Sequence, residues 1–105
     1  MASEERDIAG QVVETALDYG CVLACAESCT GGLLAAALTE RPGSSAIFDR
    51  GFVTYSNLAK QESLGVLLTT LDTFGAVSEE VAQEMALGAL ERSAAQISIS
   101  VTGIA

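Results

Sequence analysis

The chain has no histidine and a single lysine, Lys60, so the acid–base chemistry open to it is narrow. The absence of imidazole excludes Ser-His-Asp and Cys-His mechanisms and every histidine metal site. A lysine whose pKa is lowered by desolvation or by a neighbouring donor can instead act as a base toward a serine hydroxyl. The alternative is a solvated surface lysine, because lysines are rarely buried. Position alone leaves both interpretations of Lys60 open.

A turn rich in hydroxyl groups and glycine is the first place where a ligand could bind. Ser28 and Thr30 lie between an expected strand and an expected helix, and Gly31 and Gly32 stand at the helix start. Free backbone N–H groups and hydroxyls converge in such a turn, where they could hold an anion or a carbonyl. The alternative is an ordinary helix N-cap whose two glycines allow close packing.

Other polar residues lie at the ends of expected strands. Thr102 and Gly103 come just past the last strand, at the edge where open α/β sheets bind ligands. Ser45 follows Ser44 in a Pro-Gly turn, and both serines fit ordinary turn chemistry when taken alone. Glu27 could orient a ligand hydroxyl or simply end its strand in water. These residues are candidates that their types alone do not decide.

The elements that position these residues follow from apolar periodicity and from helix start and stop residues. Two helices show clear apolar faces: Ile8, Val12, Ala16 and Tyr19 in the first, and Val81, Met85 and Ala89 in the last. Ser78 caps the last helix, and Asn57 is expected to cap the one that contains Lys60. The expected helices span residues 3–19, 33–40, 58–64 and 79–92, the expected strands span 21–26, 50–55 and 97–101, and short turns or segments occupy 44–48 and 70–74.

Helices that alternate with short apolar strands predict a three-layer α/β/α sandwich formed by one domain, residues 1–105. The chain supplies only about three strands, fewer than the roughly five to six of an average sheet. The last strand also ends without an element to cover it. The sequence therefore has the pattern of the front part of a domain, truncated at its C-terminus.

The composition limits the partners and the compartment. With 14 acidic and 5 basic residues, a net charge of −9 and scattered arginines, the chain is a poor ligand for nucleic acid. It has no apolar run long enough to span a membrane and no secretion signal, so a cytoplasmic protein that does not bind membranes is expected. Cys21, Cys25 and Cys29 are expected to be reduced and mostly buried.

Five segments, taken in order, resemble the CinA C-terminal domain family, the nicotinamide-nucleotide amidases. They are Ala26-Glu-Ser-Cys-Thr-Gly-Gly32, Gly43-Ser-Ser45, Arg50-Gly-Phe-Val-Thr-Tyr-Ser-Asn57 with Lys60, Gly75-Ala-Val-Ser78 and Val101-Thr-Gly-Ile-Ala105. Each segment is weak alone, but together they are specific and cover nearly the whole chain. The resemblance implies hydrolysis of the carboxamide of nicotinamide mononucleotide to nicotinate mononucleotide and ammonia, without a metal or other cofactor.

The resemblance also implies roles for particular residues. Ser45 matches the proposed nucleophile of the family, Lys60 its base, and Tyr55 a group that positions or relays the proton. Ser28 and Thr102 match hydroxyls that line the pocket, where they would hold the amide or its developing oxyanion. A Ser/Lys pair of this kind supplies what histidine supplies elsewhere. The amidase interpretation predicts that Ser45 and Lys60 face one pocket together with the turn at Gly31.

The sequence departs from the family at its end. After Thr-Gly-Ile-Ala the family continues with further strands and a closing helix, so either the polypeptide is longer or it is a fragment. An uncovered strand edge invites pairing with another chain, and a homo-oligomer is expected. The second hypothesis for function is a non-catalytic nucleotide-binding or interaction module of a competence or DNA-damage-inducible protein, in which the same turns bind a ligand without turnover.

Overall fold

A computed structural model describes residues 3–104 of the chain, with side chains from Ile8 onward. The secondary-structure elements are α1 (Ser3–Tyr19), β1 (Leu23–Glu27), α2 (Leu33–Thr39), the 3-10 turn η1 (Ser44–Ala46), β2 (Phe48–Val53), α3 (Asn57–Leu64), α4 (Leu68–Phe74), α5 (Glu79–Glu91) and β3 (Ile97–Val101). None of the helices described is long and apolar enough to cross a bilayer.

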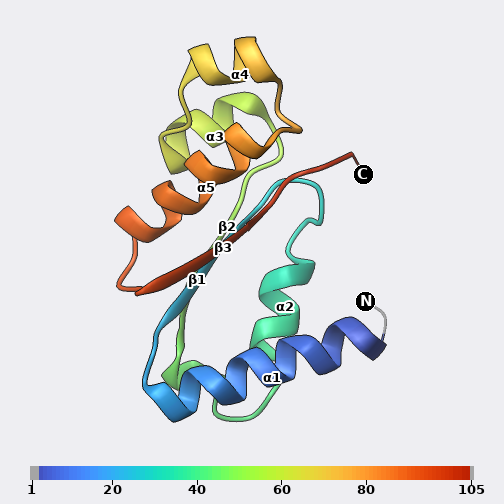
Figure 1. Ribbon diagram of the computed structural model, residues 1–105, viewed down its shortest axis with the longest axis vertical. Coiled ribbons are helices and arrows are strands. Elements are labelled where there is room, and N and C mark those ends of the chain that lie inside the picture. The colour runs from blue at the N-terminus through green and yellow to red at the C-terminus, as the bar shows by residue number, and fades with distance from the viewer. Residues whose placement is uncertain (1–2, 105) are drawn as a thin grey trace.

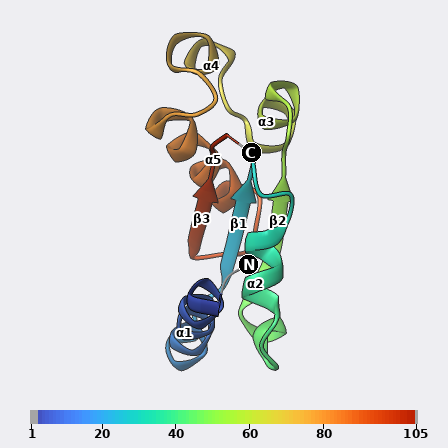
Figure 2. The ribbon, with the colours of Figure 1, turned by 90° about the vertical axis from the view of Figure 1, so that its right-hand side faces the viewer.

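The three strands form one parallel sheet in the order β2-β1-β3, with β1 in the centre (Figure 2). Strand β1 is buried over all five residues, as expected of a strand that is covered on both faces. Helices α1 and α2 lie on one face of the sheet, and α3, α4 and α5 lie on the other (Figure 1). The architecture is therefore the three-layer α/β/α sandwich that the sequence predicts.

Each face of the sheet has its own core. Side chains of α1 and α2, together with Ile47 just after η1, pack against Leu23 and Cys25 of β1 on one face. On the other face, Ala26 meets a cluster from α3, α4 and α5. The predicted buried face of α5 is confirmed: Val81, Met85 and Ala89 are fully buried. Adjacent residues of β1 thus serve opposite cores, which explains why its sequence is apolar without alternation.

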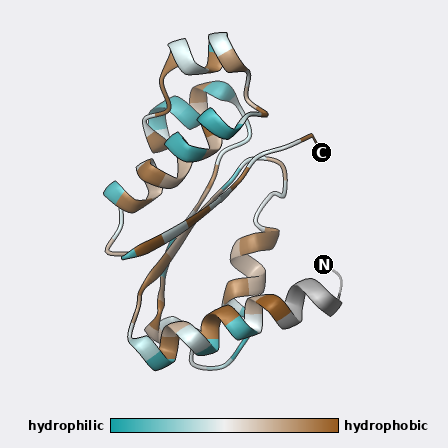
Figure 3. Ribbon diagram, viewed as in Figure 1, coloured by the Kyte–Doolittle hydropathy of each residue, from teal (hydrophilic) through white to brown (hydrophobic). Residues whose placement is uncertain are grey.

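The predicted apolar face of α1 is confirmed at Ala16 and wrong at its two ends. Ala9, Val13 and Ala16 are buried, whereas Ile8 and Tyr19 are 61% and 80% exposed. Small residues of α1 allow it to pack closely in the core, while its larger apolar side chains border an open groove. That groove, of about 540 Å³, lies between α1 and β3, both of which carry hydrophobic stretches (Figure 3).

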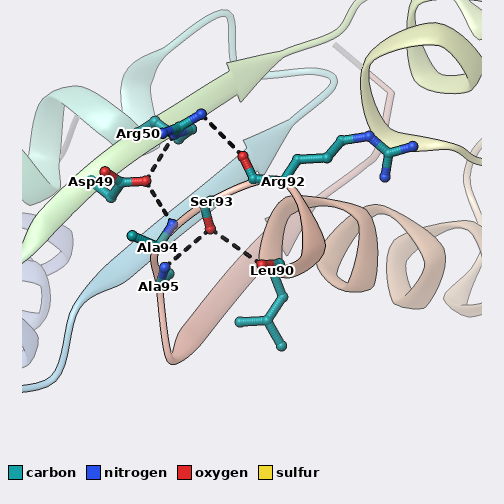
Figure 4. A network of polar contacts seen from close by, with 7 residues as sticks. All are labelled: Asp49, Arg50, Leu90, Arg92, Ser93, Ala94 and Ala95. Atoms are coloured by element: carbon teal, nitrogen blue, oxygen red, sulfur yellow. Dashed lines mark hydrogen bonds and ion pairs between the residues drawn. The ribbon is translucent and has the colours of Figure 1, made fainter.

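The connection from α5 to β3 is tied to β2 by a polar network (Figure 4). One oxygen of Asp49 accepts hydrogen bonds from the backbone N–H of Ala94 at 3.0 Å and from Nε of Arg50 at 2.8 Å. Arg50 in turn donates from Nη1 to the carbonyl oxygen of Arg92 at 3.1 Å. These bonds fix the loop that brings β3 into register on the far side of β1.

Boundaries of several elements differ from the predictions by one or two residues, and two of these differences bear on the site. Strand β2 begins at Phe48 and ends at Val53, two residues earlier than expected, because its pairing with β1 starts at Leu23. The cap of α3 is Ser56, whose hydroxyl accepts from the N–H of Ala59, and not Asn57. The shift leaves Asn57 in the first turn of the helix, with its side chain free to face a cavity.

Gly88 is the point of closest approach between α5 and α3. A Cβ atom at this position would lie 1.9 Å from the carbonyl oxygen of Leu64, which is backbone and cannot move aside cheaply. We therefore expect Gly88→Ala to destabilise the fold by about 1–3 kcal/mol through overpacking, in spite of the better helix propensity of alanine. Thermal unfolding followed by circular dichroism measures the effect. Leu87→Ala, at an exposed position of the same helix, is the control, and equal melting temperatures for the two variants would contradict the prediction.

Candidate functional site

A small cavity opens at the carboxyl edge of the sheet, where the connections that follow all three strands meet. Its volume is about 210 Å³. The lining residues are Ser28, Cys29, Tyr55, Asn57, Lys60, Ala76, Thr102 and Gly103. They come from the β1–α2 loop, from the β2–α3 connection with the first turn of α3, from the α4–α5 loop and from the segment after β3. This is the edge where open parallel sheets bind ligands.

Lys60 is the most unusual residue of the cavity because it is only 2% exposed. No carboxylate within residues 8–104 forms an ion pair with it, and burial lowers the pKa of its amine from the ordinary value of 10.5. Of the two interpretations that the sequence leaves open, the structure thus contradicts the solvated surface lysine. Desolvation thus moves the pKa of this amine in the direction that a general base requires.

Ser28 is 7% exposed and lines the same cavity as Lys60. It is the first residue after β1, and its N–H donates to the carbonyl oxygen of Val101 at 3.0 Å, which holds it against β3. Its neighbours Cys29, Thr30 and Gly31 have backbone N–H groups that bond to no other described part of the chain. The loop therefore offers one hydroxyl in the cavity and a set of unused donors beside it.

Glu27 explains the shape of this loop. The side chain is fully buried, and one carboxylate oxygen accepts a short hydrogen bond from the Thr30 hydroxyl and bonds from the N–H groups of Gly32 at 3.2 Å and Leu34 at 2.9 Å. The other oxygen accepts from the N–H of Ala35 at 2.8 Å. The carboxylate thus caps α2, which has no capping side chain of its own at Gly32.

The hydrogen bonds also set the charge of Glu27. Burial alone would raise the pKa of this carboxyl, but the bonds from Thr30, Ala35, Leu34 and Gly32 together hold it below the ordinary value of 4.5. Glu27 is therefore a carboxylate at neutral pH. The sequence analysis does not identify this capping role of Glu27. The signal for it is the cap position of α2, which holds a glycine and none of the usual capping residues serine, threonine, aspartate or asparagine.

We expect this interaction to make the protein sensitive to acid. Because the pKa of Glu27 is lower in the folded state, its contribution to stability is present above pH 4.5 and is lost as the pH falls through the folded-state value. Glu27→Gln replaces an acceptor oxygen with a donor that faces N–H groups, so it should cost about 1–3 kcal/mol at pH 7 and flatten the pH dependence. Urea unfolding at pH 3 to 7 measures both effects. The exposed Glu62→Gln is the control, and a Glu27→Gln variant as stable as this control would refute the assignment.

Several predicted site residues meet in the cavity and others do not. Ser28, Tyr55, Lys60, Thr102 and Gly103 line it, as the resemblance implies for a pocket. Thr30, Gly31 and Gly32 do not line it: they form the turn that Glu27 organises. Gly31 and Gly32 have φ angles of 63° and 107°, a region that favours glycine, so they shape the loop.

Ser45 lies elsewhere. It belongs to η1, which precedes β2, whereas Lys60 follows β2 in α3. A six-residue strand is roughly 20 Å long, so the two residues are at opposite ends of the sheet. The expectation that Ser45 and Lys60 face one pocket is wrong for this chain. Ser44 also faces away from the cavity, since it is buried and donates to the carbonyl oxygen of Thr39 at 3.2 Å.

Thr102 has a defined orientation. Its hydroxyl donates to the carbonyl oxygen of Ala76 at 2.8 Å, so the remaining lone pairs of this oxygen are available as acceptors. Tyr55 is 73% exposed and stands at the mouth of the cavity. Asn57, Cys29 and Ala76 complete the lining and were not predicted as site residues. Among the side chains that the structure describes, no group of three or more carboxylates and thiols gathers closely enough to hold a metal ion.

A buried lysine and a buried serine line a small polar cavity at the carboxyl edge of a parallel α/β sheet. The model of the CinA C-terminal domain family matches residues 5–105, and the chain belongs to this family. The crystal structure of competence/damage inducible protein CihA from Agrobacterium tumefaciens superposes with a TM-score of 0.94 at 51% identity, over 99% of this chain and 63% of that one.

Two curated relatives show how the family is named. Nicotinamide-nucleotide amidohydrolase PncC of Enterobacter agglomerans is 64% identical over 81 residues, which cover 77% of this chain and 49% of that protein. A putative competence-damage inducible protein of Caldicellulosiruptor saccharolyticus is 57% identical over 94 residues, 90% of this chain and 23% of that protein. The chain thus spans about half of the first relative and about a quarter of the second.

Proposed function

We propose that the chain carries the active site of an amidohydrolase that converts nicotinamide mononucleotide to nicotinate mononucleotide and ammonia. The observation that supports this most is the burial of Lys60 in the same cavity as Ser28, without an ion pair to any carboxylate within residues 8–104. An amine in this state is costly to bury and serves no packing need that methionine could not meet. The similarity to the PncC amidohydrolase supplies the substrate class.

In the proposed mechanism Ser28 replaces Ser45 as the nucleophile. The neutral amine of Lys60 accepts the proton of the Ser28 hydroxyl as Oγ attacks the carboxamide carbon. The ammonium of Lys60 then returns that proton to the leaving nitrogen, and ammonia departs from a tetrahedral intermediate. Water hydrolyses the resulting acyl-enzyme ester, again with Lys60 as the base.

The other residues of the cavity hold the substrate. Because the Thr102 proton is committed to Ala76, Thr102 can accept a hydrogen bond from the carboxamide NH₂ group, which places it on the amide and not on the oxyanion. The unused N–H group of Cys29, which lines the cavity, is the donor available to the developing oxyanion. One such donor contributes roughly 2.7–4 kcal/mol in enzymes where it has been removed. Tyr55 at the cavity mouth positions the substrate or relays the proton.

The test is ammonia release from nicotinamide mononucleotide, with free nicotinamide as the comparison substrate. It is run on this chain and on a chain extended past Ala105 with the corresponding segment of the Agrobacterium relative. Release that is lost in Lys60→Ala supports the proposal. Calorimetric binding of the mononucleotide by both chains without ammonia release would overturn it, and would favour a non-catalytic nucleotide-binding module.

A further inference from the structure

The three cysteines of the chain lie in three different environments. Cys21 precedes β1 and borders the apolar groove beside α1. Cys25 lies in the middle of β1, where burial and the nearby carboxylate of Glu27 raise the pKa of its thiol to about 12. Cys29 is half-buried and lines the cavity that contains Ser28. Because the thiolate is the reactive form, the raised pKa protects Cys25 from reaction. Cys21 and Cys29 differ in which cavity each of them lines.

Cys29 is placed where an adduct would close the cavity. Its sulfur lies 3.4 Å from the position that a Cβ of Gly103 would occupy, so it contacts the opposite wall, formed by the segment after β3. The cavity of about 210 Å³ has little room beyond a small ligand. A substituent on this sulfur would therefore occupy space that the proposed function assigns to substrate.

A second observation indicates which chemical class reaches this sulfur. Lys60 is 2% exposed and lines the same cavity. It forms no ion pair with any carboxylate described in the chain. The protonated form of an amine in that position attracts negatively charged groups, even though the chain as a whole carries a net charge of −9. Anionic reagents should consequently be drawn to Cys29 and repelled elsewhere.

We propose that Cys29 is a modification site that forms a mixed disulfide with small disulfides that bear carboxylates, and that this adduct blocks the active site. The statement that activity is blocked rests on the proposed function. The Cys29 thiolate attacks one sulfur of the reagent, so a new S–S bond forms and the S–S bond of the reagent breaks. The other half of the reagent leaves as a thiolate and takes up the proton that Cys29 released. Cys29 is oxidised, the reagent is reduced, and a free thiol reverses the step.

The first experiment measures labelling and does not depend on catalysis. The chain is treated with 5,5′-dithiobis(2-nitrobenzoic acid), and mass spectrometry of peptides locates the adduct, with uncharged 4,4′-dithiodipyridine as the matched reagent. We expect Cys29 to react about tenfold faster than Cys21 with the anionic reagent, and Lys60→Met to remove most of that preference. Cys21→Ser should keep the fast reaction and Cys29→Ser should lose it. Labelling that is faster at Cys21, or equal at both thiols, would overturn the proposal.

The second experiment separates this proposal from the proposed function. Ammonia release is measured before treatment, after treatment with oxidised glutathione, and after dithiothreitol. The proposal that the adduct blocks the active site is supported by two results together. The unsubstituted chain loses activity with oxidised glutathione and regains it with dithiothreitol, and the activity of Cys29→Ser is the same before and after treatment. Full activity of a chain labelled at Cys29 would overturn it. If neither this chain nor the extended chain releases ammonia, the amidase is refuted, while the labelling rates still decide whether Cys29 is the modification site.

Discussion

Ser28→Ala is expected to lower kcat/KM for ammonia release by at least about 10³-fold. The hydroxyl of Ser28 is the one nucleophile of the proposed mechanism that lies in the cavity with Lys60, and its loss leaves only binding and oxyanion stabilisation. Alanine fits the space, because Ser28 is held by its backbone N–H to Val101 and not by its side chain. Steady-state kinetics with nicotinamide mononucleotide and a melting curve for the folded state are the measurements.

Ser45→Ala is the matched control for this change. Ser45 is exposed, lies before β2 and is far from the cavity, so its replacement should leave kcat/KM within about twofold. If instead Ser45→Ala abolished turnover and Ser28→Ala did not, the nucleophile would be the one that the family resemblance implies. Such a result would require Ser45 to reach the cavity of another copy of the chain.

Lys60→Met is expected to abolish activity and, at the same time, to stabilise the fold. The amine is buried and pairs with none of the carboxylates that the structure describes, so the folded state bears a desolvation cost that methionine of similar length removes. A gain of about 1 kcal/mol or more would raise the melting temperature by roughly 4–8 °C per kcal/mol in a chain of this size. Differential scanning calorimetry at pH 7 is the measurement.

The pH dependence distinguishes this explanation from a general gain in hydrophobicity. Because the pKa of Lys60 is lowered in the folded state, the unfolded chain binds more protons between the folded value and 10.5, and stability rises with pH in that window. The advantage of Lys60→Met should therefore shrink as the pH approaches 10.5. Lys60→Arg stays charged and should be inactive without being stabilised. An advantage that is constant from pH 7 to 10 would argue against a charged, desolvated amine.

Much of the fold could be predicted because local signals and the final packing agree. Helix α5 has a capping serine, acids in its first turn and a regular apolar face, and it was predicted to within one residue. Helix α1 shows where this reasoning fails. Its largest apolar residues, Ile8 and Tyr19, suggest the buried face, but tight packing on the sheet selects the small residues Ala9 and Ala16. Periodicity identifies a helix, and the size of the available space decides which side is buried.

The site was predicted less completely because residue types do not state which end of a strand they occupy. Lys60, Tyr55 and Thr102 follow strands, and they converge at one edge of the parallel sheet. Ser45 precedes a strand and is carried to the opposite edge, although it lies nearer to Lys60 in sequence than Ser28 does. The direction of each strand, read together with the motifs, would have separated Ser28 from Ser45. The capping role of Glu27 can be recognised only in the folded loop, because its hydrogen-bond partners lie three to eight residues further along the chain.

The carboxylate of Glu27 has a consequence for the thermodynamics of ligand binding. Its four hydrogen bonds fix the backbone from the end of β1 to the first turn of α2, so the conformational entropy of this loop is lost when the chain folds. A ligand that enters the cavity meets donors that are already oriented, and it does not have to order them. Backbone order parameters of residues 28–32 should accordingly be high in the free protein and change little on binding. This is the behaviour of a preorganised site and not of induced fit.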